Sequence, residues 1–195
     1  MLGVSTLEEC LEAVQKDGDV LEFVPEQWKT DSVCLAAVQQ NGVSVYYVPE
    51  NKQTPELCLM AVSIDGWALE GVSNRMKTHE LCLAAAKENG MALDFVPKEI
   101  MTPEIILAGV QSNGYGIQFI LEEQMTPEIC LAAVRNSGHA IDKIPTNKWT
   151  QEMILIALKD AWRPDTWPEL NIEWTEEMRM LASMDGWHPG IWGKN

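Results

Sequence analysis

Basic residues are scarce in this sequence. Its 195 residues include 14 lysines and arginines against 29 aspartates and glutamates, a formal net charge of -15 at pH 7. Proteins that bind nucleic acid or an anionic membrane need clustered Lys and Arg, so direct binding to either is not expected. The acidic excess has two interpretations: it keeps the protein soluble, or it attracts a basic partner, in the extreme case by mimicking a nucleic acid.

Long apolar runs are also missing. No stretch approaches the roughly 18 residues of a membrane-spanning helix. The first residues, MLGVSTLEEC, hold no basic region followed by an apolar one. We therefore expect a cytoplasmic protein with neither a membrane span nor a Sec-type export signal. With 46% hydrophobic residues, the chain is nevertheless able to bury a core.

Catalytic motifs are absent as well. The sequence has no G-x-S-x-G, no phosphate-binding G-x-x-x-x-G-K, no H-E-x-x-H and no dinucleotide-binding loop. The three histidines, His79, His139 and His188, accompany no serine or cysteine motif. We therefore predict a protein that is not an enzyme and that uses no cofactor.

What the sequence does contain is a repeat of 24 residues. Threonines in unbroken register mark seven units, at Thr6, Thr30, Thr54, Thr78, Thr102, Thr126 and Thr150. Five places after each threonine stands a leucine, at Leu11, Leu35, Leu59, Leu83, Leu107, Leu131 and Leu155. Twelve places after it, the first six units have a glycine, at Gly18, Gly42, Gly66, Gly90, Gly114 and Gly138, and the seventh has Trp162. An eighth, degenerate unit begins at Thr175.

Each unit is predicted to open with a helix of about ten residues. The threonine oxygen can accept a hydrogen bond from a free N–H of the first turn, and three units place a proline next, at Pro55, Pro103 and Pro127. Glutamates two places after the threonine complement the helix dipole, at Glu8, Glu56, Glu80, Glu104, Glu128 and Glu152. Residues four, five, seven and eight places on are predicted to share the buried face, as in Cys58, Leu59, Ala61 and Val62. The glycine is predicted to end the helix in the left-handed backbone conformation.

The second half of each unit predicts one very short helix. Apolar residues three apart, such as Leu93 and Val96, suit one turn of α or 3₁₀ helix, which a proline then stops at Pro25, Pro49, Pro97 and Pro145. Such a pair of helices cannot bury an apolar face alone, but stacked copies can. We therefore predict an all-α solenoid of about seven to eight repeats. Its tandem repeats would cover residues 1–161, and a degenerate last repeat with a cap residues 162–195.

The repeated segments resemble a known family. TPELCLMAVSIDGWALEGV and TPEICLAAVRNSGHAIDKIP are similar to the bacterial repeats of domain of unknown function 4116, over about residues 6 to 161. The resemblance implies a helical repeat without an assigned activity. The unit length is also similar to that of the leucine-rich repeat variant, whose repeats pair an α-helix with a 3₁₀ helix, an analogy of fold only. After Ala161 the pattern departs from the family.

The five cysteines share one place in the unit, at Cys10, Cys34, Cys58, Cys82 and Cys130. Ile106 and Ile154 take this place in two other units, which indicates an apolar position. Neighbouring helices pack about 8–10 Å apart, too far for disulfides between equivalent cysteines. One cysteine per unit does not supply the close pairs of a zinc site. We predict buried, reduced thiols and no bound metal.

The tail is rich in tryptophan, with Trp162, Trp167, Trp174, Trp187 and Trp192. Large aromatic side chains can cover the open apolar end of the last repeat, so we predict a cap there. The alternative is a surface for a partner, because exposed tryptophan is typical of binding hot spots.

A candidate binding surface follows from the residue after each glycine. This place accepts residues as different as Asp19 and Val43, so it is predicted to face solvent. Stacking would align four large side chains into one stripe, Trp67, Met91, Tyr115 and His139. Neutral variation at surface sites is the alternative.

The function predicted first is a non-catalytic module that binds another protein or a peptide. The alternatives are an acidic decoy or inhibitor of a basic, nucleic-acid-binding partner, and a structural spacer. Because the resembled family is bacterial, delivery into a host cell by a specialised secretion system stays open beside a cytoplasmic location.

Overall fold

The computed structural model describes residues 6–162 and 173–183, and these fold into helices without any strand. The long helices are α1 (Leu7–Lys16), α2 (Asp31–Gln40), α3 (Pro55–Ile64), α4 (His79–Glu88), α5 (Pro103–Ser112), α6 (Pro127–Asn136), α7 (Gln151–Lys159) and α8 (Glu176–Ser183). The first six have ten residues each, as predicted. The fold is the all-α repeat solenoid that the 24-residue period predicts.

Each of the first six long helices is followed by two 3₁₀ helices. The longer one of each pair is η1 (Gly18–Phe23), η3 (Gly42–Tyr47), η5 (Gly66–Gly71), η7 (Gly90–Phe95), η9 (Gly114–Phe119) and η11 (Gly138–Lys143). The shorter one is η2 (Glu26–Trp28), η4 (Glu50–Lys52), η6 (Asn74–Met76), η8 (Lys98–Ile100), η10 (Glu122–Gln124) and η12 (Thr146–Lys148). The longer helix ends before the proline as predicted, but the prediction of a single short helix missed the second one.

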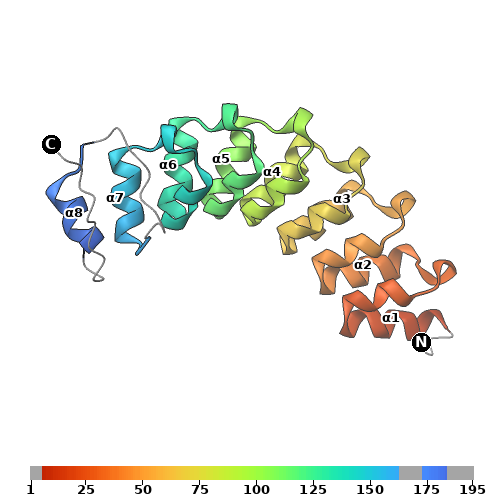
Figure 1. Cartoon of the computed structure of the whole chain (residues 1–195). Helices are drawn as coiled ribbons and strands as arrows, with labels where there is room; N and C mark the ends of the chain where they lie inside the picture. The colour runs from red at the N-terminus through yellow and green to blue at the C-terminus, as the bar shows by residue number, and fades with distance from the viewer. Residues whose placement is uncertain (1–5, 163–172, 184–195) are drawn as a thin grey trace.

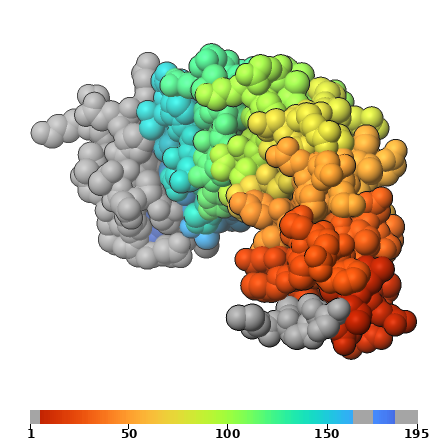
Figure 2. Space-filling view, turned by 90° about the vertical axis from the view of Figure 1, so that its right-hand side faces the viewer, coloured from red at the N-terminus to blue at the C-terminus, as the bar shows by residue number. Residues whose placement is uncertain are grey.

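The units stack in chain order along an arc, with α1 and α8 at its opposite ends (Figure 1). Each of the helices α2 to α6 packs against the long helices before and after it and against the longer 3₁₀ helices of its own and the preceding unit. In the space-filling view, each band of the described chain follows the one before it in sequence (Figure 2). The core is therefore a continuous layer built by contacts between neighbouring units.

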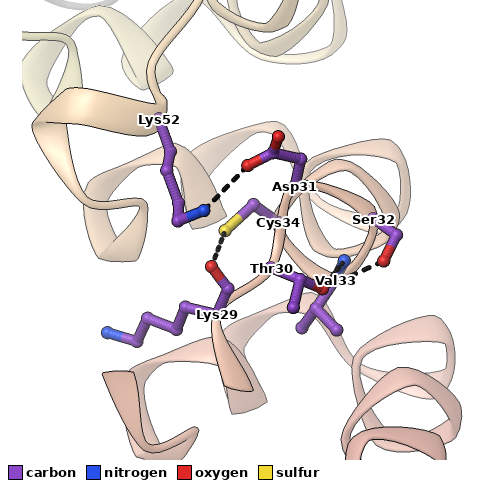
Figure 3. Close-up of polar contacts among 7 residues, drawn as sticks. All are labelled: Lys29, Thr30, Asp31, Ser32, Val33, Cys34 and Lys52. Carbon is purple, nitrogen blue, oxygen red and sulfur yellow. Dashed lines mark hydrogen bonds and ion pairs between the residues drawn. The ribbon is translucent and has the colours of Figure 1, made fainter. Parts of the chain in front are cut away.

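The threonines begin the long helices as predicted. Every unit threonine from Thr6 to Thr150 accepts a hydrogen bond at Oγ1 from the backbone N–H three residues on. Thr175 does the same for α8, where Met178 N–H donates to its Oγ1 at 3.2 Å. Figure 3 shows this arrangement at α2, where Val33 N–H donates to Thr30 Oγ1.

The prediction that the glycines end the long helices in the left-handed conformation is wrong. Each of the first six helices ends two residues before the glycine, and the residue between them is extended, as at Asn89 with φ -146° and ψ 115°. The Asn89 side chain then accepts a hydrogen bond from Met91 N–H and so begins η7. The glycine is the first residue of the 3₁₀ helix, and no described glycine has the positive φ of left-handed backbone.

The glycines are required for another reason, which is the close approach of the next unit. A Cβ atom on Gly90 would lie 2.1 Å from the carbonyl oxygen of Gly109 in α5. On Gly114 it would lie 2.3 Å from the carbonyl oxygen of Ala133 in α6. No side chain fits at these distances, so glycine sets how closely consecutive units stack.

The buried side chains come from both halves of the unit. The apolar pairs of the second half are buried as predicted, including Leu93 with Val96 and Ile117 with Ile120. In the long helices the buried residues lie three, four, seven and eight places after the threonine, as in α3 with Leu57, Cys58, Ala61 and Val62.

The seventh unit ends differently from the others. Ala161, which takes the place of the extended residue, has φ 56° and is the one non-glycine residue with positive φ in the described chain. Trp162 N–H then donates to the Ala157 carbonyl at 2.9 Å. The fully buried Trp162 packs edge-on against Trp149 at 5.5 Å between ring centroids. Its indole N–H donates to Asp142 Oδ1 at 2.7 Å.

The predicted tryptophan cap is described only in part. Trp174 is half-buried and packs against the core, and α8 packs against α7. Trp167, Trp187 and Trp192 lie outside the described residues. The cap therefore stays a prediction.

Candidate binding surface

The invariant leucines do not lie where the sequence pattern places them. We call Leu11, Leu35, Leu59, Leu83, Leu107, Leu131 and Leu155 the leucine row. Leu35 is 38% exposed and Leu59 40%, and the other five are half-buried. The prediction that the leucine lies on one helical face with the cysteine therefore holds only in part: the five half-buried leucines pack against the edge of the core, and none of the seven is fully buried.

Helix geometry explains the difference. Successive residues are about 100° apart around an α-helix, so the residue after a fully buried one lies well round the helix from it. The buried side of α3 is centred between Leu57, Cys58, Ala61 and Val62. Leu59 falls on the flank of that side, where its side chain meets solvent. Equivalent leucines on stacked helices then form a row at about 8–10 Å intervals.

Glutamates accompany the leucine row on the exposed side of the helices. We call Glu8, Glu56, Glu80, Glu104, Glu128 and Glu152 the glutamate row, and all six are exposed. Each lies three residues before a leucine of its own helix, and residues three apart are neighbours on a helix surface. Apolar and acidic side chains therefore alternate across the same face of the solenoid.

Two ion pairs show which residue of the preceding unit faces the glutamate. Arg135 Nη2 of α6 lies 2.7 Å from Glu152 Oε1 of α7. Lys159 Nζ of α7 lies 2.9 Å from Glu177 Oε1 of α8, one unit further on. In both cases the cation is nine places after its own threonine and the glutamate two places after the next.

In three other units the facing residue carries no charge. The places that correspond to Arg135 and Lys159 hold Gln39 before Glu56, Ser63 before Glu80 and Gln111 before Glu128. None of these three glutamates has an ion-pair partner among the described residues. Glu104 differs, because His79 Nε2 lies 3.7 Å from its Oε2. Within the row, an arginine therefore compensates the negative charge at α7, whereas no cation does so at α3, α4 and α6.

A shallow groove lies on this face where α5 meets α6. Its volume is about 470 Å³, and its lining includes Leu107 and Gln111 of α5 with Glu128, Leu131 and Arg135 of α6. Two members of the leucine row and one of the glutamate row thus border the same depression. The groove is able to take an apolar side chain beside a charged one.

The stripe predicted from the sequence occupies the second residue of four 3₁₀ helices, η5, η7, η9 and η11. Trp67 is 39% exposed and Tyr115 37%, His139 is exposed, and Met91 is half-buried. Trp67 also packs against Phe95 of the next unit, with 5.5 Å between ring centroids. That these four residues bind a partner stays a prediction.

The cysteines are buried and free, as the pattern predicts. All five are fully buried and none is in a disulfide. Burial raises the pKa of the Cys58 and Cys82 thiols to about 11. The Cys34 Sγ–H donates to the Lys29 carbonyl at 3.7 Å (Figure 3). A protonated thiol inside the core is a poor nucleophile at neutral pH.

No group of three or more His, Cys, Asp and Glu side chains that could hold a metal ion occurs in the part of the chain that the structure describes. Within that same part, no helix is both long and apolar enough to cross a bilayer.

The stacked helix and 3₁₀ pairs define the chain as an all-α repeat protein of the solenoid class. Residues 7–51 and 54–101 match the model of the family described as Domain of unknown function (DUF4116), which confirms the resemblance seen in the sequence. The two matched segments cover the first four units. No curated protein and no solved structure matches the chain.

Proposed function

We propose that the chain is a non-catalytic binding module that holds a peptide or an extended segment of another protein along the leucine row. The observation that carries this proposal is a leucine kept in all seven units at a place where its side chain remains partly in solvent. The fully buried place beside it, by contrast, accepts cysteine and isoleucine. Aligned apolar side chains at a protein surface are typical of an interaction site.

The repeat geometry suits an elongated partner. Stacked units present the same side chain at regular intervals, so a chain that lies along the row makes equivalent contacts with each unit. The groove between α5 and α6 supplies one depression for such a contact. The five cysteines are buried, so no thiol is exposed on this face among the described residues.

Selection from a random peptide library displayed on phage would test the proposal. The full chain serves as bait. The affinity of each selected peptide is then measured for two double variants, Leu59→Ser/Leu83→Ser and Trp67→Ala/Tyr115→Ala. We expect the leucine variant to lose at least about tenfold in affinity, about 1.4 kcal/mol, and the aromatic variant to change little. If the aromatic variant loses affinity and the leucine variant does not, the binding surface is the stripe on the 3₁₀ helices instead.

A second candidate function is an acidic decoy that occupies a basic surface by charge. It is favoured by the net charge of -15 and by the exposed glutamates without ion pairs. Salt separates the two functions, because exposed charge pairs are screened within about 8 Å at physiological ionic strength. Affinity for a decoy target should collapse as salt rises, whereas affinity that depends on the leucine row should persist.

A further inference from the structure

The distribution of ion pairs along the glutamate row carries an inference about the chemistry of the partner, and this inference rests on the proposed function. Of the three cations that stand nine places after a unit threonine, Arg135 and Lys159 pair with the glutamate of the next unit, whereas Lys87 forms no ion pair among the described residues. Where Gln39 and Ser63 stand instead, Glu56 and Glu80 keep an uncompensated charge beside Leu59 and Leu83. We propose that the segment held by the leucine row is basic, and that its Lys or Arg side chains pair with Glu56, Glu80 and Glu128.

Charge complementarity with the glutamates, together with the apolar contact to the leucines, favours a basic segment over a neutral one. A neutral apolar segment would cover these glutamates without pairing them, and taking a carboxylate out of water without a partner is unfavourable. A basic segment supplies the cation that Arg135 and Lys159 supply to the last units from within the chain. The same comparison places the partner over α3 to α6, because further along the solenoid the glutamates are already paired.

The spacing of the units also selects a conformation and a sequence period for the partner. Stacked helices are about 8–10 Å apart. A polyproline II segment rises about 3.1 Å per residue, so residues three apart are about 9 Å apart. A segment with one basic and one apolar residue in every three therefore presents both at the interval of the glutamates and leucines. The groove between α5 and α6, with Glu128 beside Leu107 and Leu131, is one such combined contact.

Synthetic peptides of defined sequence test the inference on the full chain. The probe is a fluorescein-labelled peptide of five Arg-Pro-Leu triplets, in which proline favours the polyproline II conformation. Two controls replace every arginine by glutamine or by glutamate. Binding is measured by fluorescence anisotropy at ionic strengths of about 0.01 M and about 0.15 M.

The variants are matched pairs from the same row. Glu56→Gln/Glu80→Gln removes two uncompensated charges, and we expect about fivefold to tenfold weaker binding of the arginine peptide. Glu152→Gln removes a charge that Arg135 already pairs, and we expect a change of less than about twofold. Ser63→Lys places a cation opposite Glu80 and should weaken binding in the same direction as the glutamine variants. Circular dichroism and the melting temperature of each variant show that the fold is kept.

The outcomes separate the inference from the proposed function. Tight binding of the arginine peptide that depends on Glu56 and Glu80 but not on Glu152 supports the inference. If the glutamine peptide binds as tightly, and Leu59→Ser/Leu83→Ser weakens it, the inference is overturned while the proposed function stands. If the arginine peptide binds but the leucine variant leaves its affinity unchanged, the contact is one of charge alone and both are overturned. No binding of any of the three peptides overturns the inference and leaves the proposed function to the library selection.

Discussion

The residues four and five places after each threonine are neighbours in the sequence but lie on different faces of the long helices. The first place is fully buried and holds cysteine in five units and isoleucine in two. The second is partly exposed and holds leucine in all seven. A core position requires an apolar side chain of suitable volume and tolerates exchanges that keep it. The comparison teaches that uniformity between repeats is not a measure of burial, and that the more uniform of two places can be the surface one.

The largest loss of stability is expected at the glycines that begin the longer 3₁₀ helices, because the next unit leaves no room there for a side chain. Gly114→Ala would place a Cβ 2.3 Å from the Ala133 carbonyl oxygen, so the two units must separate. We expect the free energy of unfolding to fall by about 3 kcal/mol, the upper end of the cost of overpacking. Urea denaturation followed by circular dichroism measures it. Ser63→Ala, on the exposed side of α3, is the control and should change it by less than about 0.5 kcal/mol.

The next test compares the two faces directly in α3. Cys58→Ser introduces a hydroxyl into an apolar site and should cost about 2 kcal/mol. Leu59→Ser removes a side chain that is 40% exposed and should cost about 1 kcal/mol, towards the lower end of what its partial burial contributes. Equal costs in urea denaturation would mean that the leucine row is part of the core, and the comparison would fail.

A smaller effect is expected from alkaline pH through the thiols of the buried face. Burial raises the pKa of Cys58 from its ordinary 9.0 to about 11, so the thiol ionises in the unfolded chain before it ionises in the folded one. The stabilisation is therefore complete below pH about 9 and decreases as the pH rises to about 11.

The measurement is the free energy of unfolding of the parent chain and of Cys58→Ala across this pH range. The variant lacks one of the thiols with a raised pKa, so its curve should fall less steeply. Parallel curves would show that burial does not hold back the ionisation of this thiol.

The smallest effect is expected at the end of α7, which differs from the ends of the six long helices before it. Ala161 has φ 56°, a conformation that costs an alanine about 1–2 kcal/mol and a glycine little. Part of this gain is offset because glycine is more flexible in the unfolded chain. Ala161→Gly should therefore raise the free energy of unfolding by about 0.5–1 kcal/mol. A lower melting temperature for Ala161→Gly than for the parent chain would contradict the left-handed backbone at this residue.

Much of the fold follows from the sequence because the period is strict. The threonine caps, the ten-residue helices and the buried pairs such as Leu93 and Val96 all depend on contacts within one unit or on simple periodicity. The role of the glycines does not, because the carbonyl that approaches Gly90 belongs to Gly109 in the next unit. The second 3₁₀ helix was missed because it buries no residue and so has no apolar spacing.

The candidate site was predicted less well than the fold. The exposure of Trp67, Tyr115 and His139 follows from the variety of residues at their place in the unit. The partial exposure of the leucine row does not follow from the spacing of apolar residues, because that spacing groups the leucine with the buried cysteine before it. The signal that separates the two was present in the sequence, since Ile106 and Ile154 replace cysteine while nothing replaces leucine. The pairing of Arg135 with Glu152 requires the register of adjacent units, which only the structure supplies.

The confinement of packing to neighbouring units has a kinetic consequence. Residues that touch are close in the sequence, so little loop entropy opposes the formation of the first contacts, and proteins of this kind fold fast for their size. A folding nucleus can arise at any adjacent pair of units and spread in both directions. The order of local opening should follow the order of the chain, and backbone amides of α1, which packs against one long helix among the described residues, should exchange with deuterium sooner than those of α4, which packs against two.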